Sequence, residues 1–185
     1  MKRSVSLIVA GTHLILPIVN RDERFLLEIR AGDRLVQNMN IALPREGEAY
    51  WLASYPLSHF GLAGEEITVQ VAEGVAIDEP YLYGLSLVRI GDDQPEQRDE
   101  DYAKPYRNQF HPSPRRGWGN DPNGMVYQDG TYHLYFQYNP LGIGWGNKHW
   151  GHFASADLVH WEELPIPLYM KTVRDKAFSG GGFLD

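Results

Sequence analysis

Residues 124–139, GMVYQDGTYHLYFQYN, contain two runs of β-forming residues on either side of Asp129-Gly130. An Asp-Gly pair between two such runs is a strong signal for a tight β-hairpin. Two further strands are predicted from HWGHFASA (149–156) and VHWEELPIPLY (159–169). Four consecutive antiparallel strands within about 45 residues have the usual size of one β-propeller blade.

A single blade cannot bury both of its faces, so it is expected to stack on neighbouring blades. No second copy of the blade pattern occurs in the 185 residues. The last residues, FSGGGFLD (178–185), predict the opening strand of a next blade. The carboxyl-terminal half therefore predicts the beginning of a propeller that these residues do not complete.

The amino-terminal half also predicts β-structure, because short runs of β-forming residues alternate with turn residues. The seven predicted strands are VSLIV (5–9), HLILPIV (13–19), RFLLEIR (24–30), RLVQNMNIAL (34–43), AYWLASY (49–55), EITVQVA (66–72) and YGLSLVRI (83–90). Seven short strands at this spacing favour a small antiparallel β-sandwich. No catalytic residue types gather there, so a structural role is the simplest interpretation. A sugar-binding role, by analogy with accessory β-sandwiches, stays open.

Charge is distributed unevenly along the chain. Residues 92–101, DDQPEQRDED, hold six acids and one base and so carry −5 of the net charge of −7. Such a run predicts a solvated linker. We expect a β-sandwich-like domain over 1–91, an acidic linker over 92–105 and a second β-domain over 106–185. The negative charge argues against nucleic acid or an anionic membrane as a partner.

The sequence contains no cysteine, which excludes disulfides, cysteine-ligated zinc and a thiol nucleophile. No apolar run reaches the roughly 18 residues of a membrane-spanning helix. A secretory signal is an alternative interpretation of the amino terminus, where basic residues precede an apolar stretch. Gly11 and Pro17 interrupt that stretch and no small-residue cleavage site follows, which favours two strands joined by a turn at Gly11-Thr12.

The most informative motif is WGNDPNG (118–124). Pro122 has a fixed φ and no amide donor, and Asn123-Gly124 favours a tight turn. The motif predicts that Asp121 is held at the mouth of a strand beginning at Gly124. A carboxylate held there can act as a nucleophile on a sugar carbon. The same four residues, Asp-Pro-Asn-Gly, are also explained as an ordinary turn.

The flanking motifs favour the catalytic interpretation. WGNDPNG is followed by YHLYFQYNP (132–140), WGNKHWGHFASADLVHWEELPIPL (145–168) and FSGG (178–181). In this order and spacing, residues 106–185 resemble glycoside hydrolase family 32, the invertases, inulinases, levanases and other β-fructosidases. Residues 1–105 more loosely resemble the β-sandwich that precedes the catalytic domain in some bacterial fructan-degrading members.

The resemblance implies an all-β protein, a small β-sandwich followed by the first blade of a five-bladed β-propeller with a funnel-shaped active site. It implies a retaining hydrolase of β-fructosyl linkages in fructans or sucrose, an enzyme that needs no cofactor and no metal. Asp121 matches the nucleophile of the family. The residues that match substrate contacts are Asn120, Gln137, Trp145, Phe178, Ser179 and Trp118.

The chain also departs from the family. Gly119 stands where the family usually has a larger apolar residue, and Gly181 where it often has Ser. Both glycines are expected to loosen the backbone around the pocket. The downstream Arg-Asp-Pro motif and the Glu-Cys motif, which carries the acid/base Glu, do not occur in these 185 residues.

A retaining glycosidase needs two carboxyl groups about 5–5.5 Å apart, so the missing motifs leave two hypotheses. The chain is a piece of an active β-fructosidase, which as a whole is expected to be extracellular or periplasmic because polymeric fructans are met outside the cytoplasm. Alternatively, it is an inactive remnant or a fructoside-binding module.

Other polar residues of the second half carry weaker signals. His149 and His152 invite a metal-site interpretation, but residues three apart on a strand point to opposite faces and cannot chelate one ion together. Glu162 and Glu163 lie on the outer strand of the blade and are expected to be solvated.

Overall fold

The computed structural model describes residues 3–47, 49–94 and 101–184. The chain divides into two compact units, unit 1 (Met1–Gln97) and unit 2 (Arg98–Asp185). The predicted acidic linker falls partly outside the described residues, since 95–100 are not among them.

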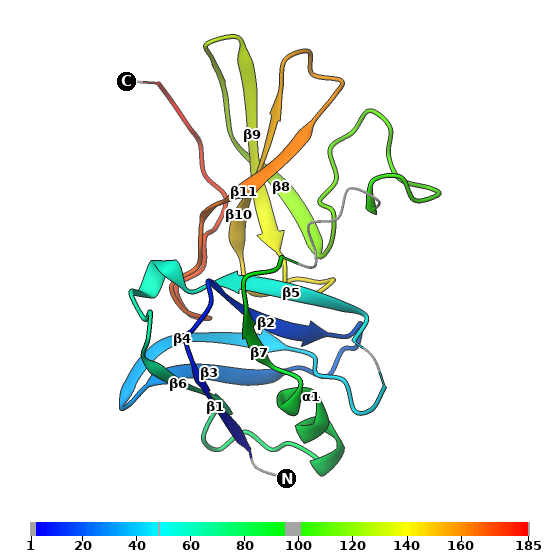
Figure 1. Ribbon diagram of the computed structural model, residues 1–185. Helices are drawn as coiled ribbons and strands as arrows, with labels where there is room; N and C mark the ends of the chain where they lie inside the picture. The colour runs from blue at the N-terminus through cyan, green and yellow to red at the C-terminus, as the bar shows by residue number, and fades with distance from the viewer. Residues whose placement is uncertain (1–2, 48, 95–100, 185) are drawn as a thin grey trace. The chain divides into compact units, whose positions relative to one another are not determined.

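Unit 1 contains two antiparallel sheets (Figure 1). The four strands of the first lie in the order β1 (Ser4–Ile8), β6 (Glu66–Val71), β3 (Phe25–Ala31) and β4 (Arg34–Ile41). The three strands of the second lie in the order β5 (Trp51–Pro56), β2 (His13–Ile18) and β7 (Arg89–Gly91). Six of the seven predicted strands are confirmed, each with ends within two residues of the prediction.

The core of unit 1 follows from the period-2 pattern of its strands. Alternate residues of β3 are buried, beginning with Phe25, and the same alternation runs through β5 and β6. β2, the central strand of its sheet, is buried from Leu14 to its end, so both of its faces are covered at this point, since successive side chains of a strand point to opposite faces. The Gln37 Nε2 of β4 donates to the Tyr55 hydroxyl of β5 at 2.8 Å, which links the two sheets across the core.

The predicted strand at 83–90 is wrong over most of its length. A 3-10 turn (Glu79–Tyr81) and helix α1 (Leu82–Ser86) occupy this region, and β7 has only three residues. Pro80 suits the first turn of a helix because it lacks the amide hydrogen that is unpaired there. A Cβ on Gly84 would lie 2.6 Å from Cδ of Pro44, so the close packing of α1 requires glycine. A second 3-10 turn spans Ser58–Phe60.

Unit 2 is built on one four-stranded antiparallel sheet in the order β11 (Glu162–Leu168), β10 (His149–Ser155), β9 (Thr131–Asn139) and β8 (Trp118–Gln128) (Figure 1). This order confirms the predicted blade. The β8–β9 hairpin turns at Asp129 (φ 47°) and Gly130 (φ 84°), the two positive φ angles that a type I′ turn requires.

Two details of the blade differ from the prediction. β8 begins at Trp118 rather than at Gly124, and its pairing with β9 shifts register between Gly119 and Pro122 and again between Asn123 and Val126. Residues 178–184 form no strand, although a next strand was predicted from them. They are held instead by side-chain and backbone hydrogen bonds to the blade, as described below.

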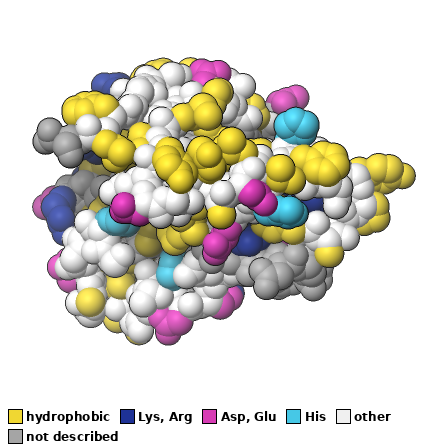
Figure 2. Space-filling view, turned by 90° about the horizontal axis from the view of Figure 1, so that it is seen from above, with side chains coloured by type: hydrophobic (Ala, Val, Ile, Leu, Met, Phe, Trp, Pro, Cys, Tyr) yellow, Lys and Arg dark blue, Asp and Glu magenta, His cyan; other side chains and the backbone are white. Residues whose placement is uncertain are grey.

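The core of unit 2 is small and aromatic. Phe136, Tyr138 and Phe153 are buried, and the rings of Phe136 and Phe153 stack at 4.9 Å. Large apolar side chains remain exposed on the blade, among them Met125, Tyr127 and Leu168. Figure 2 shows hydrophobic side chains spread across the face seen from above. The core side chains cover only one face of a single sheet. The other face of the blade is available to a neighbouring element.

Candidate active site

The irregular start of β8 exposes Asn120 and Asp121. Gly119 pairs with Tyr138 and Pro122 with Phe136, so β8 contains one residue more than β9 between these two pairs. Such a β-bulge interrupts the ladder and re-aims side chains. Asn120 and Asp121 lie within the bulge and are exposed, whereas Asn123, just after it, is buried.

Asp121 is the centre of a hydrogen-bonded cluster. Asn120 Nδ2 donates to Asp121 Oδ1 at 2.9 Å, and Ser179 Oγ donates to Asp121 Oδ2 at 2.8 Å. Gln137 Nε2, on the buried inner part of β9, donates to Ser179 Oγ at 2.6 Å. Each carboxylate oxygen thus has a donor, and hydrogen bonds to a carboxylate are stronger than those between neutral groups. Four of the seven predicted site residues are connected in this way.

The segment that carries Ser179 is fixed to the blade on both sides of that residue. The indole Nε1 of Trp150 donates to the carbonyl of Phe178 at 2.8 Å. The amide of Gly124 donates to the carbonyl of Gly180 at 3.1 Å. These bonds explain how a segment without regular secondary structure holds the Ser179 hydroxyl within hydrogen-bond distance of Asp121.

Trp145 and Phe178 are 57% and 56% exposed. The Lys148 ammonium lies 4.6 Å from the ring centroid of each of them. A second ammonium, that of Lys176, lies 4.2 Å from the centroid of Trp145. Sequence reasoning missed Lys148, because nothing in the motif distinguishes a lysine between two rings from one on the surface.

Trp118 and Gly119 are set apart from this cluster. Trp118 pairs with Asn139 at the start of β8 and is partly exposed, and within the described residues its indole is not bonded to Asp121. Gly119 was expected to loosen the backbone. A Cβ at this position would instead lie 3.1 Å from the Pro114 ring, so Gly119 allows the preceding segment to pack closely.

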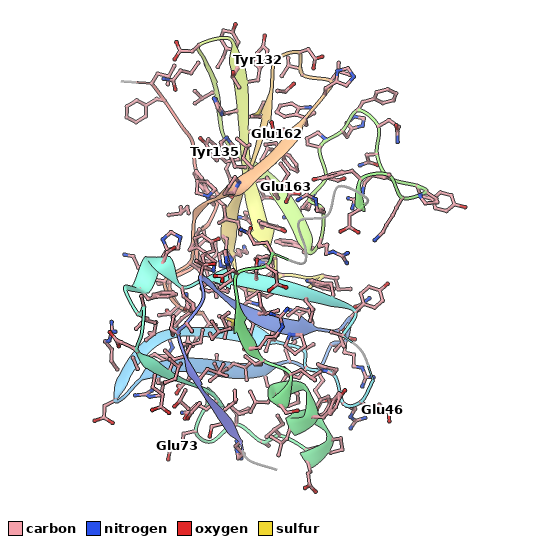
Figure 3. All side chains as sticks on the ribbon, in the orientation of Figure 1. Glu46, Glu73, Tyr132, Tyr135, Glu162 and Glu163 are labelled. Atoms are coloured by element: carbon pink, nitrogen blue, oxygen red, sulfur yellow. The ribbon has the colours of Figure 1, made fainter. Side chains whose placement is uncertain are left out.

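The expectation that both glutamates of β11 are solvated is wrong for one of them. Glu163 Oε2 accepts hydrogen bonds from the Tyr102 hydroxyl at 2.5 Å and from the Arg115 amide at 2.8 Å. Burial raises the pKa of Glu163. Glu162 is exposed as expected. Figure 3 labels both side chains on β11. Strand alternation put one of them inward, and the segment 102–115 supplied donors that no local pattern could reveal.

Asp101, the last residue of the acidic run, is not solvated either. Its side chain is 2% exposed and pairs with Arg116 at 2.8 Å and with Lys104. Burial by itself would raise the pKa of this carboxyl, but the hydrogen bond from Lys104 and the charge of Arg116 lower it overall. The end of the run therefore belongs structurally to unit 2.

The two histidines lie in different surroundings. His149 is completely buried, with Nδ1 against the carbonyl of Asn147, and burial lowers its pKa to about 4. His152 Nε2 lies 3.0 Å from His133 Nδ1, and its ring stacks on Tyr135 at 4.3 Å. Within the described ranges no three histidine or acidic side chains gather as a metal site would require. The described residues also contain no helix with the length and apolar character that crossing a bilayer requires.

Comparison with known proteins points to one family. Residues 111–185 match the Glycosyl hydrolases family 32 N-terminal domain. The chain is 54% identical over 88 residues to an extracellular exo-inulinase of Aspergillus niger, a match that covers 45% of this chain and 16% of that protein. It is 51% identical over 84 residues to a levanase of Bacillus subtilis, covering 45% of this chain and 12% of the levanase.

A third relative is a sucrose-6-phosphate hydrolase of Zymomonas mobilis, 52% identical over 73 residues, covering 38% of this chain and 14% of the relative. The chain thus spans only a small part of the length of the relatives it matches. The matched part contains the four strands of the blade and the cluster around Asp121. Residues 111–185 therefore match part of the N-terminal domain of glycoside hydrolase family 32.

Proposed function

We propose that the protein containing this chain hydrolyses β-fructosyl linkages of fructans or sucrose with retention of configuration, with Asp121 as the nucleophile. The observation that carries this proposal is the convergence of Asn120 and Ser179 on the two oxygens of the Asp121 carboxylate, with Gln137 behind Ser179. Donors on both oxygens hold a carboxylate in one orientation, which a nucleophile must have to attack a defined carbon.

The retaining mechanism assigns a task to each group. Asp121 attacks the anomeric carbon of the fructosyl unit and forms a covalent intermediate, which water then hydrolyses. A second carboxyl group about 5–5.5 Å away first protonates the leaving oxygen and later deprotonates the water. The Glu163 carboxylate already accepts hydrogen bonds from the Tyr102 hydroxyl and the Arg115 amide. We therefore propose that the second carboxyl group comes from a part of the whole protein that this sequence does not contain.

The aromatic residues supply the binding surface. Trp145 and Phe178 present exposed rings next to the segment that carries Ser179. Sugar rings have CH-rich faces that pack on aromatic side chains, and such packing also excludes water from the reacting carbon. We propose that the rings of Trp145 and Phe178 form the walls of the fructosyl-binding site. The hydroxyl groups of the fructosyl unit are bound by three polar side chains, Asn120, Gln137 and Ser179. Trp118 is assigned to the aromatic surroundings.

The relatives guide the choice of substrate and location. Their names specify inulin, levan and sucrose 6-phosphate as substrates, and the exo-inulinase is described as extracellular. All three substrates contain a β-fructosyl linkage. We therefore propose that the substrates of the whole protein are β-fructosides. A polymer cannot enter a cell freely, so we propose that the whole protein acts outside the cytoplasm.

Replacing Asp121 tests the proposal most directly. In the whole protein, Asp121→Asn is expected to lower kcat for fructose release from sucrose, inulin and levan by at least about 10⁴-fold, because a neutral amide cannot form the covalent intermediate. Asp129→Asn is the matched control, since it makes the same change in the hairpin turn, where asparagine also tolerates a positive φ. This control is expected to retain activity.

Two results would contradict the proposal. Retention of activity by Asp121→Asn, with an unchanged circular dichroism spectrum, would exclude Asp121 as the nucleophile. Binding of fructosides by the wild-type whole protein without any release of fructose, measured by calorimetry and chromatography, would identify a binding module instead.

A further inference from the structure

Lys148 occupies an unusual position for a lysine. It immediately precedes β10, and only 4% of the residue is exposed. Its ammonium lies between the rings of Trp145 and Phe178, 4.6 Å from each centroid. Lysine is among the residues that are almost never fully buried unless they are paired. The burial of Lys148 therefore needs an explanation, and the two rings supply one.

The rings are the partners of this cation in the described part of the chain, where Lys148 forms no ion pair with a carboxylate. A cation within about 6 Å of a ring centroid is attracted by the ring quadrupole, and more strongly when water is excluded. One ammonium between two rings attracts both of them. Lys148 therefore restrains the position of each ring relative to the other.

Lys148 also holds the chain that carries Phe178. Its carbonyl accepts a hydrogen bond from the amide of Ala177 at 3.0 Å. The side chain contacts the ring of the next residue, and the residue after that is Ser179, which donates to Asp121. This segment has no regular secondary structure, so such contacts decide where its side chains lie.

We propose that Lys148 is a positioning residue that holds Trp145 and Phe178 as two aromatic walls beside the Asp121 cluster. It acts through the rings rather than on the reacting atoms. Trp145 and Phe178 bind the fructosyl unit only if the proposed function is correct, so the kinetic part of this inference rests on that function. The contact of the ammonium with both rings does not depend on it.

Kinetics of the whole protein test the role in binding. Lys148→Met keeps the length of the side chain and removes the charge. We expect it to raise KM for sucrose about tenfold, the equivalent of about 1.4 kcal/mol, with kcat within about twofold of wild type, since the walls bind ground state and transition state alike. Lys148→Arg retains a cation and is expected to restore most of the lost affinity.

Lys171→Met is the matched control. It removes the same charge from an exposed lysine that pairs with Asp175 at 3.9 Å, and it is expected to leave KM and kcat unchanged. Equal KM values for Lys148→Met and wild type would overturn the proposal. A fall of kcat at constant KM, or a failure of Lys148→Arg to restore affinity, would also overturn it, because each would assign Lys148 a role other than holding the walls.

Amine labelling of the whole protein, read by mass spectrometry of its peptides, tests the contact without any assay of activity. Lys148 is expected to react at least about tenfold more slowly than Lys171, because the rings and the blade cover it. Phe178→Ala is expected to accelerate labelling of Lys148 and not of Lys171. Equal labelling rates of both lysines in wild type would refute the contact itself. If protection is observed but no fructoside is hydrolysed, the proposed function fails and the contact stands.

Discussion

The two units bury very different kinds of side chain. Among the described residues, unit 1 buries 25 hydrophobic residues and a single polar one, Gln37. Unit 2 buries five hydrophobic residues and eight polar or charged ones, among them Asp101, Gln137, Lys148 and His149. Unit 1 thus has the interior of an ordinary stable domain, whereas the interior of unit 2 is organised by hydrogen bonds and charges.

The difference shows how a fold divides stability from positioning. Apolar burial is not directional and is roughly proportional to the area removed from water, so it stabilises a core without fixing single atoms. Hydrogen bonds are directional and weak in net terms, about 1 kcal/mol each, but a buried polar group without a partner is costly. Unit 2 therefore specifies where Asp121, Ser179 and Gln137 lie, at the expense of an apolar core.

Leu16→Ala is the strongest test of this division. Leu16 is fully buried in β2, and its truncation is expected to destabilise unit 1 by about 3–5 kcal/mol through lost burial and a cavity. Because the two described donors to Asp121, Asn120 and Ser179, belong to unit 2, kcat for fructose release is expected to stay unchanged under folding conditions. Denaturant unfolding, monitored by hydrogen exchange of the amides of unit 1, measures the free energy of unfolding of that unit. A loss of kcat in the folded variant would show that the division is wrong.

Acid is expected to weaken unit 2. His149 has a pKa of about 4 in the folded protein, against 6.5 for an ordinary histidine, because burial disfavours its charged form. Above pH 6.5 both states are neutral, so this group has no effect there. Between pH 6.5 and 4 the unfolded state binds the proton first, and unit 2 is expected to lose about 3 kcal/mol of stability.

His149→Gln isolates this effect, since an amide can donate to the Asn147 carbonyl but does not titrate in this range. The free energy of unfolding of the variant is expected to vary less with pH between 6.5 and 4. A smaller dependence of the same sign is expected to remain, because partial burial and the charge of His133 lower the pKa of His152. An unchanged slope would exclude His149 as its source.

The smallest expected difference separates two neighbouring glutamates. Glu163→Ala removes the acceptor of the Tyr102 hydroxyl and the Arg115 amide and leaves both donors without it, and is expected to cost about 2 kcal/mol. Glu162→Ala makes the same change at an exposed position and is expected to stay within about 0.5 kcal/mol of wild type. Thermal unfolding of the two variants at one pH gives the comparison. Equal effects would mean that Glu163 is solvated, as the sequence predicts.

Much of the architecture follows from local sequence. The Asp129-Gly130 hairpin and the strands of the blade were predictable, because turn chemistry and β-forming runs act over a few residues. The region 82–86 was not, since its apolar residues fit a strand and only the closeness of Gly84 to Pro44 favours the packed helix. Short apolar runs do not distinguish a buried strand from a buried helix.

The candidate site divides in the same way. The residue types at Asn120, Asp121, Gln137 and Ser179 could be selected from motifs, which are local. Their connection could not, because Ser179 reaches Asp121 from 58 positions along the chain. Glu163, Asp101 and Lys148 were missed for the same reason, since each has a partner distant in sequence, namely Arg115, Arg116 and Phe178 in that order.

By itself, the sequence determined that this protein is all-β and that its second half resembles the start of a family 32 propeller blade, and it made Asp121 the candidate nucleophile. Each of these depends on neighbouring residues. Only the tertiary structure decided which polar groups are buried and which residues share a hydrogen bond. It bonded Ser179 to Asp121 and Tyr102 to Glu163 and placed the ring of Phe178 against Lys148, because those contacts join segments that the sequence keeps apart.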